Sequence, residues 1–292
     1  MEQVKVEVPD GTLTALRFGA GPKIAIAAHG ITASAMAYLA VARRMPADWS
    51  LIALDLRGRG GSAELPGPYG MTRHAEDICA AATQFGQGRP VALVGQSMGA
   101  YAALRAATRR PELFTRLVLV DGGLPLPTVP GADPDAVLAA TLGPAIARLS
   151  DTFPSVEAYV DFFRAHPALA AEWTDDMTEY VRYDATGPDG AIRSRVNPEA
   201  VRADGRDLLV EADSFAADLR GLAVPTVLLH APRGMFGQEP GLLPEPLVAH
   251  WRDRAPHLVT ELVDANHYTI LMTDGPAATI ARRLTAEEGS RG

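Results

Sequence analysis

The sequence has a single cysteine, only two lysines and no long uninterrupted apolar run. One cysteine, Cys79, excludes an internal disulfide and a metal site built from several cysteines. No window approaches the roughly 20 apolar residues of a membrane-spanning helix without a charge or a proline. The first residues, MEQVKVEVPDG, lack the basic and apolar regions of a secretory signal. We therefore expect a cytoplasmic protein with Cys79 as a small side chain on the apolar face of a helix.

Basic residues are fewer than acidic ones, 27 against 35. The net charge is −8 over 292 residues, and no basic block interrupts the chain. Nucleic acids and anionic membranes are therefore poor candidate partners. Apolar residues make up 47% of the chain, which is enough for a sizeable core and argues against disorder. We expect a monomer or homodimer that binds a small-molecule substrate without a cofactor.

Short apolar segments alternate with amphipathic patterns along most of the chain. Helices are predicted over residues 34–45, 72–85 with Thr72 as N-cap, 98–109 and 276–288. The predicted strands are VKVEV, TLTALRF, KIAIAAHG, WSLIALDL and residues 91–94, 117–120, 224–231 and 257–263. This alternation predicts an α/β fold in which a mostly parallel eight-stranded sheet is flanked by helices. The first two strands would form an antiparallel edge.

The alternation stops after Asp121. The segment GGLPLPTVPGADPD is rich in proline and glycine, and residues 133–213 show helical patterns without a convincing strand. This predicts an inserted helical lid over residues 124–213. The lid would divide the core domain into a first part, 1–123, and a second part, 214–292.

A lone serine lies between two glycines where the fifth predicted strand meets a helix, in the sequence GQSMG. A sharp turn at this place would project the hydroxyl of Ser97, and bulky residues at Gly95 and Gly99 would collide with it. The helix that begins at Met98 directs backbone N–H groups towards the same point. The glycine spacing does not match a phosphate-binding loop. The pattern therefore predicts that Ser97 is a nucleophile.

Three further motifs accompany this turn in the order HGITAS, DLRGRGGS and, near the end of the chain, DANHYTI. Together the four motifs resemble those of the α/β-hydrolase family, and the resemblance covers nearly the whole chain. It implies that His267 is the base that activates Ser97. It also implies that the backbone N–H groups of Met98 and Ile31 form the oxyanion hole.

The other histidines are expected to be structural. His29 lies in the turn that precedes Ile31, His74 and His166 are predicted on a helix or lid surface, and His230 ends a strand. No two histidines have the helical spacing, with a carboxylate, that zinc ligands show. We therefore predict no metal site.

The position of the acid that would orient His267 departs from the commonest family pattern. In that pattern the acid follows the strand that corresponds to TVLLHA. No aspartate occurs in the next residues, PRGMFGQEPGLLPEP. Two candidates remain: Asp121, which ends a strand 24 residues after Ser97, and Glu239 in the later loop. Some family branches, including several haloalkane dehalogenases and zearalenone-type lactone hydrolases, resemble this chain in placing the acid at that strand end. We favour Asp121 over Glu239, and expect Asp264 to point elsewhere.

These residues predict a serine hydrolase that cleaves a carboxylic ester or lactone of a small apolar or aromatic substrate through an acyl-enzyme. The lactone rests on the placement of Asp121. Carbon–carbon bond hydrolysis, thioester hydrolysis and perhydrolysis on the same triad remain alternatives, as does a ligand receptor without turnover. The residues expected to line the substrate pocket are His29, Gly30, Gln96, Met235 and Phe236. Aromatic residues of the lid either line this pocket or pack the lid itself.

Overall fold

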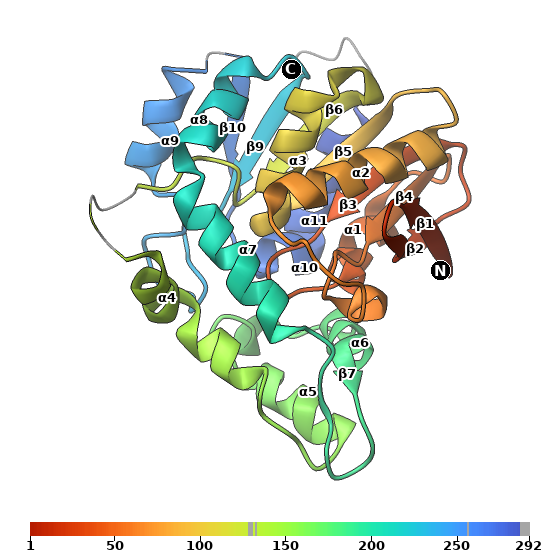
Figure 1. Cartoon of the computed structure of the whole chain (residues 1–292), viewed down its shortest axis with the longest axis vertical. Helices are drawn as coiled ribbons and strands as arrows, with labels where there is room; N and C mark the ends of the chain where they lie inside the picture. Colours follow the sequence, from red (N-terminus) through yellow and green to blue (C-terminus); the bar gives the residue numbers. More distant parts are fainter. Residues whose placement is uncertain (128–130, 132, 256, 287–292) are drawn as a thin grey trace.

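Eight strands form one sheet in a computed structural model that describes residues 1–127, 131, 133–255 and 257–286. The strand order is β1-β2-β4-β3-β5-β6-β9-β10 (Figure 1). β1 pairs antiparallel with β2, β2 pairs antiparallel with β4, and the other pairs are parallel. The fold class predicted from the sequence is therefore confirmed. The strands are β1 (Glu2–Val8), β2 (Gly11–Phe18), β3 (Lys23–Ala28), β4 (Trp49–Leu54), β5 (Val91–Gln96), β6 (Phe114–Val120), β9 (Thr226–His230) and β10 (Leu258–Leu262).

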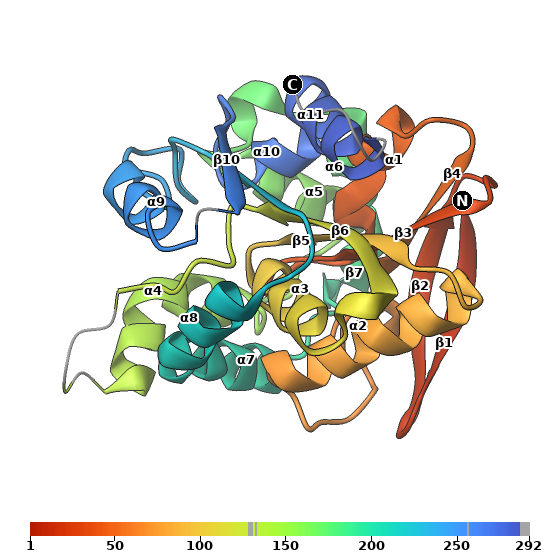
Figure 2. The same cartoon turned by 90° about the horizontal axis from the view of Figure 1, so that it is seen from above.

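Helices cover both faces of this sheet (Figure 2). Helices of one face share a large apolar cluster: α2 (Met71–Gly86), α3 (Met98–Arg109), α8 (Ala212–Gly221) and α9 (Glu245–Arg252). A second cluster lies under α1 (Leu39–Arg44), α10 (Thr269–Met272) and α11 (Asp274–Thr285). Because both faces are covered, all six residues of the central strand β5 are buried.

The predicted insertion, residues 124–213, follows β6 and extends away from the sheet (Figure 1). We call it the inserted segment. Its helices are α4 (Pro134–Arg148), α5 (Val156–Arg164), α6 (Asp175–Asp184) and α7 (Pro198–Val210). It also contains an antiparallel pair, β7 (Ala185–Thr186) and β8 (Arg193–Ser194), where the sequence predicts no strand. Strands of two residues are too short to show a periodic pattern.

The start of α2 differs from the prediction because its first N–H groups bond to another helix. α2 begins at Met71 with Gly70 as its N-cap, and Thr72 does not cap it. The N–H of Gly70 donates to a carboxylate oxygen of Asp204 at 2.6 Å, and that of Met71 donates to Asp207 at 2.7 Å. Both acids belong to α7. These two carboxylates accept the N–H groups that a local N-cap side chain would otherwise bind.

Other boundaries shift by less. The helix predicted over 34–45 is a 3-10 turn, η1 (Ala35–Tyr38), followed by the short α1. The last helix ends at Thr285, and residues 287 and 288 of its predicted range lie outside the described part of the chain. The remaining 3-10 turns are η2 (Gly60–Ser62), η3 (Pro111–Leu113) and η4 (Ala170–Glu172).

No helix in the described part of the chain is both long and apolar enough to cross a membrane. Cys79 is half-buried on α2 and packs against the apolar cluster on that face, as the sequence predicts.

Candidate active site

Ser97 occupies a tight turn between β5 and α3. Its backbone has φ 53° and ψ −122°, a conformation that residues other than glycine rarely adopt. A Cβ atom added at Gly95 would lie 2.2 Å from the carbonyl oxygen of Gly99. One added at Gly99 would lie 2.1 Å from the carbonyl oxygen of Ala28. Both glycines are therefore needed for the close approach of strand and helix at the turn.

His267 lies between Ser97 and Asp121, in the loop that follows β10. Its Nε2 is 3.1 Å from the hydroxyl oxygen of Ser97, and its Nδ1 is 2.6 Å from a carboxylate oxygen of Asp121. The imidazole and the carboxylate are buried, and Ser97 is half-buried. A carboxylate beside Nδ1 favours a proton on that nitrogen, so the lone pair of Nε2 faces the serine hydroxyl. The geometry is that of a nucleophile, a base and an orienting acid.

The sheet explains how Asp121 reaches this place. Asp121 directly follows β6, whose neighbour β5 ends beside Ser97. The N–H of Ser97 donates to the carbonyl of Val120 at 2.9 Å, and the N–H of Asp121 donates to Leu229 at 2.8 Å. The second carboxylate oxygen of Asp121 accepts the N–H of Ala231 at 3.1 Å. The acid is thus held by the ends of two adjacent parallel strands.

The other two acids considered from the sequence lie elsewhere. Glu239 is exposed in the loop between β9 and α9. Asp264 pairs with Arg233 at 2.8 Å, and its side chain is 90% exposed. Of the three carboxylates, the structure brings Asp121 to the imidazole of His267.

The two expected oxyanion donors adjoin the serine. Met98 is the first residue of α3, where a helix leaves its N–H groups without an intrahelical acceptor. Ile31 follows Gly30, and a Cβ added at Gly30 would lie 3.3 Å from the Cβ of Ser97. The carbonyl of Ile31 accepts the Nε–H of Arg59 at 2.9 Å, which fixes this turn. The role of these two N–H groups stays a prediction.

A buried ionic network supports the same turn, and the sequence did not reveal it. Arg59 is fully buried and donates to Asp204 on α7, and the Nε2 of His74 lies 3.0 Å from the same carboxylate oxygen. Burial alone would raise the pKa of Asp204, but the charges and hydrogen bonds of His74 and Arg59 outweigh it and lower the pKa. The prediction that His74 lies on a surface is therefore wrong.

His29 is structural, as expected. Its Nε2 accepts the N–H of Leu56 at 3.0 Å, and its Nδ1 lies 2.7 Å from the carbonyl oxygen of Gly30. Complete burial lowers the pKa of His29 to about 3, so the ring is neutral at physiological pH. Both ring nitrogens thus have protein partners, one in the turn and one after β4, and the expectation that His29 lines the substrate pocket stays a prediction.

Gln96 links the loop of His267 to the turn at Gly30 and Ile31. Its Nε2 donates to the backbone carbonyl of His267 at 3.1 Å. Its Oε1 lies 2.7 Å from the position that a Cβ of Gly30 would take. Gln96 therefore touches two of the predicted elements of the site, whereas its contact with a substrate stays a prediction.

The other expected pocket residues lie in the loop after β9. Met235 is half-buried, and Phe236 is 56% exposed. The ring of Phe236 stacks on His166, with 5.7 Å between centroids, and His166 meets the edge of Tyr268. This row of rings joins the inserted segment to the residue after His267. That Met235 and Phe236 bind a substrate stays a prediction.

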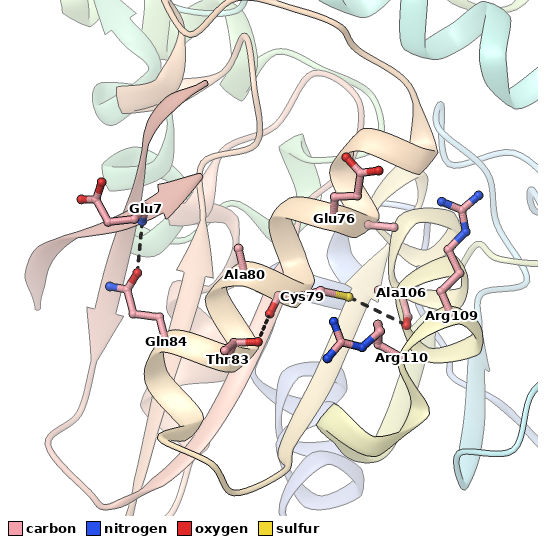
Figure 3. Close-up of a pocket in the computed structure, with 10 residues that line it drawn as sticks. Glu7, Glu76, Cys79, Ala80, Thr83, Gln84, Ala106, Arg109 and Arg110 are labelled. Carbon is pink, nitrogen blue, oxygen red and sulfur yellow. Dashed lines mark hydrogen bonds between the residues drawn. The ribbon is translucent and has the colours of Figure 1, made fainter. Parts of the chain in front are cut away.

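A surface cavity of about 630 Å³ lies away from this site (Figure 3). Arg109 lines it at the far end of α3, about 17 Å along the helix from Met98. The thiol of Cys79 lies 4.0 Å from the carbonyl oxygen of Ala106 there, and burial raises its pKa to about 11. Among the described residues, no three histidine, cysteine or acidic side chains are grouped to hold a metal ion.

Comparison with known proteins identifies the family of the chain. Residues 25–282 match the description "Alpha/beta hydrolase family". The chain belongs to this family.

Several curated proteins are relatives of this chain, and two of them illustrate matches over part of their length. One is N-formylmaleamate deformylase of Pseudomonas putida, 40% identical over 107 residues, or 36% of this chain and 40% of the relative. The other is 2-(acetamidomethylene)succinate hydrolase of Mesorhizobium japonicum, 30% identical over 117 residues, or 40% of this chain and 41% of the relative. The matches thus span about two fifths of each relative.

The fold as a whole resembles a solved structure. That of E-2-(acetamidomethylene)succinate hydrolase superposes with a TM-score of 0.77, covering 97% of this chain and 98% of the other at 21% identity. At this identity the likeness shows the fold alone.

Proposed function

We propose that the protein hydrolyses a small carboxylic acyl compound through an acyl-enzyme on Ser97. The observation that carries the proposal is the bonded series Ser97–His267–Asp121, with separations of 3.1 and 2.6 Å. Each separation is within the range at which a base removes a proton from a nucleophile or an acid orients a base.

His267 shuttles a proton in each half of the reaction, first the proton of Ser97 and then one from water. His267 takes the proton while the serine oxygen bonds to the substrate carbonyl carbon, and the N–H groups of Met98 and Ile31 stabilise the resulting oxyanion. His267 then gives the proton to the leaving atom as its bond to carbon breaks. A water molecule attacks the acyl-enzyme by the same route and frees the acid and Ser97.

The bond that is cleaved is an acyl–nitrogen bond in our proposal. Both curated relatives carry names that describe such substrates, an N-formyl and an acetamido compound. An amine leaves only when it is protonated, and His267 is placed to supply that proton. The carboxylic ester or lactone expected from the sequence is the second candidate, because the same triad attacks the more reactive ester carbonyl.

The inserted segment acts as the lid of this site in our proposal. Its aromatic residues do not by themselves support an aromatic substrate, because several pack on one another. Tyr159 contacts Phe153 and Phe163, with 4.8 and 5.2 Å between ring centroids, and Phe162 contacts both phenylalanines. Tyr159, Phe153 and Phe163 thus belong to the apolar cluster of the inserted segment itself, and Phe162 lies at its surface.

The test compares two substrates that share an acyl group, phenyl acetate and acetanilide, with formanilide as a smaller amide. We expect turnover of the ester and of at least one amide, labelling of the protein by a fluorophosphonate, and loss of all three in Ser97→Ala. Ester turnover without amide turnover would select the second candidate. Labelling without turnover of any acyl compound would favour a ligand receptor. Turnover that survives in Ser97→Ala would overturn the proposal.

A further inference from the structure

Arg148 carries a charge inside the inserted segment that no acid neutralises directly. It is half-buried in the last turn of α4. Among the described residues, no carboxylate forms an ion pair with Arg148, whereas Arg164 and Arg182 of the same segment each pair with an acid three residues away. A cation in a partly dry interior is costly unless a partner reaches it.

The protein fixes this guanidinium in one place. Its Nη1 donates to the hydroxyl of Tyr159 at 3.0 Å, and its Cζ lies over the Phe163 ring, 4.9 Å from the ring centroid. The hydroxyl of Tyr159 donates in turn to the buried carboxylate of Asp184 at 2.6 Å. Only one of the guanidinium nitrogens is used by these contacts. The planar group is therefore oriented before any ligand arrives.

Two sets of contacts bring the end of α4, with Arg148, near the active site. On one side, its neighbours Ile146 and Leu149 pack in one apolar cluster with Ile31, the predicted oxyanion residue. On the other side, the guanidinium lies on the ring of Phe163, and Phe163 and Tyr268 pack against the same apolar cluster.

Tyr268 connects this side to the base, because its ring meets the imidazole of His267 edge-on at 5.5 Å between centroids. His267 delivers its proton to the leaving group. A leaving group on the Tyr268 side of the imidazole would therefore extend towards Arg148.

We infer that Arg148 binds a carboxylate on the leaving group of the substrate. The inference rests on the proposed function and narrows the substrate to anionic acyl compounds. A guanidinium suits a carboxylate because both are planar and form two parallel hydrogen bonds. The acidic protein as a whole repels anions, with a net charge of −8, so the preference has to come from a local cation.

The experiment uses two esters of closely similar intrinsic reactivity, phenyl acetate and 3-acetoxybenzoate, which differ by one carboxylate on the leaving group. The variants are Arg148→Gln, Arg148→Lys and, as matched control, Arg182→Gln, which removes an exposed positive charge from the same segment. Thermal unfolding of each variant shows whether the fold is retained.

We expect the wild-type protein to prefer the anionic ester in kcat/KM. A charge-assisted hydrogen-bonded pair is typically stronger than a neutral one, so Arg148→Gln should lower kcat/KM for that ester by about 10- to 100-fold. Phenyl acetate should lose no more than about threefold, Arg148→Lys should be intermediate, and Arg182→Gln should leave both esters unchanged. Equal losses on both esters in Arg148→Gln would show a structural role and overturn the inference.

A binding measurement separates this inference from the proposed function. Calorimetry with Ser97→Ala follows binding of 3-acetoxybenzoate without turnover, alone and combined with Arg148→Gln. If the wild-type protein turns over neither ester nor amide, the proposed function fails, while binding that depends on Arg148 would still support the carboxylate site. Binding of equal strength with and without Arg148 would refute the site whatever the turnover.

Discussion

Replacing Asp121 with asparagine should disable His267 while leaving the fold in place. In the structure one carboxylate oxygen of Asp121 accepts the N–H of Ala231 at 3.1 Å, and the other lies 2.6 Å from Nδ1 of His267. In Asp121→Asn the amide oxygen keeps the first contact, so the amide NH₂ faces Nδ1. An NH₂ group only donates, so Nδ1 has to accept and the ring proton moves to Nε2. The ring then cannot take the proton of Ser97.

The size of this effect follows from the triad logic. The same replacement in a serine protease triad lowers kcat by about 10⁴-fold, which corresponds to about 5.5 kcal/mol of transition-state stabilisation. Asparagine matches aspartate in shape and tolerates the φ of 44° found at Asp121. Thermal unfolding should therefore change little. Glu239→Gln, at an exposed site, serves as control and should stay within about twofold of wild type.

The assay is kcat/KM on phenyl acetate for the two variants and the wild-type protein, each checked for folding. A loss of less than about tenfold in Asp121→Asn would refute the tautomer argument, because the geometry leaves no second acceptor for Nδ1 among the described side chains. A larger loss in Glu239→Gln than in Asp121→Asn would assign the acid to the later loop.

Three other predictions address the surroundings of the site. The unfolded chain protonates His29 near pH 6.5, whereas the folded chain does so only near pH 3. This residue should therefore lower the free energy of unfolding as pH falls between these values. Denaturant unfolding should show a larger loss in the wild-type protein than in His29→Gln, and parallel pH curves for the two proteins would contradict the prediction. With a pKa of about 11, Cys79 should react with iodoacetamide at pH 8 at least about 100-fold more slowly than a free thiol, measured by mass spectrometry. Gly99→Ala should abolish activity and lower the melting temperature sharply, because the added Cβ would lie 2.1 Å from the backbone of Ala28. As a control, Gly221→Ala should match the wild-type protein in both assays, because the closest contact of its Cβ is 3.7 Å away.

Local patterns predicted the parts of the site that depend on local geometry. The glycines around Ser97 signal the turn because the backbone there excludes larger side chains, and the strand before it and the helix after it are both present. Asp121 could be ranked first because the usual position held no aspartate and a strand end supplied one. The sequence could not give the distance between the imidazole of His267 and the carboxylate of Asp121, because the two residues lie 146 positions apart in the chain.

The buried ionic contacts between distant residues could not be predicted from the sequence, for a physical reason. Arginine is normally found at the surface, so its pattern gives no sign that Arg57 and Arg59 are completely buried. Arg57 forms two hydrogen bonds with Asp77, at 2.6 and 3.0 Å. Arg59 and His74 meet Asp204 across more than 100 residues. A polar residue in a helical pattern predicts exposure unless its partner is known, and the misplacement of His74 follows from that.

The same contacts change how the inserted segment relates to catalysis. α7 supplies Asp204, which holds Arg59, and Arg59 donates to the carbonyl of Ile31, whose N–H is a predicted oxyanion donor. α6 supplies Tyr183, whose hydroxyl donates at 2.5 Å to Asp55 at the end of β4. If the inserted segment swung away as one body, these buried bonds would break and Arg59 would lose its counter-charge. The loss of a buried partner charge typically costs about 3–5 kcal/mol. We therefore expect α7 to stay in place beside the turn at Ile31 when a substrate reaches Ser97.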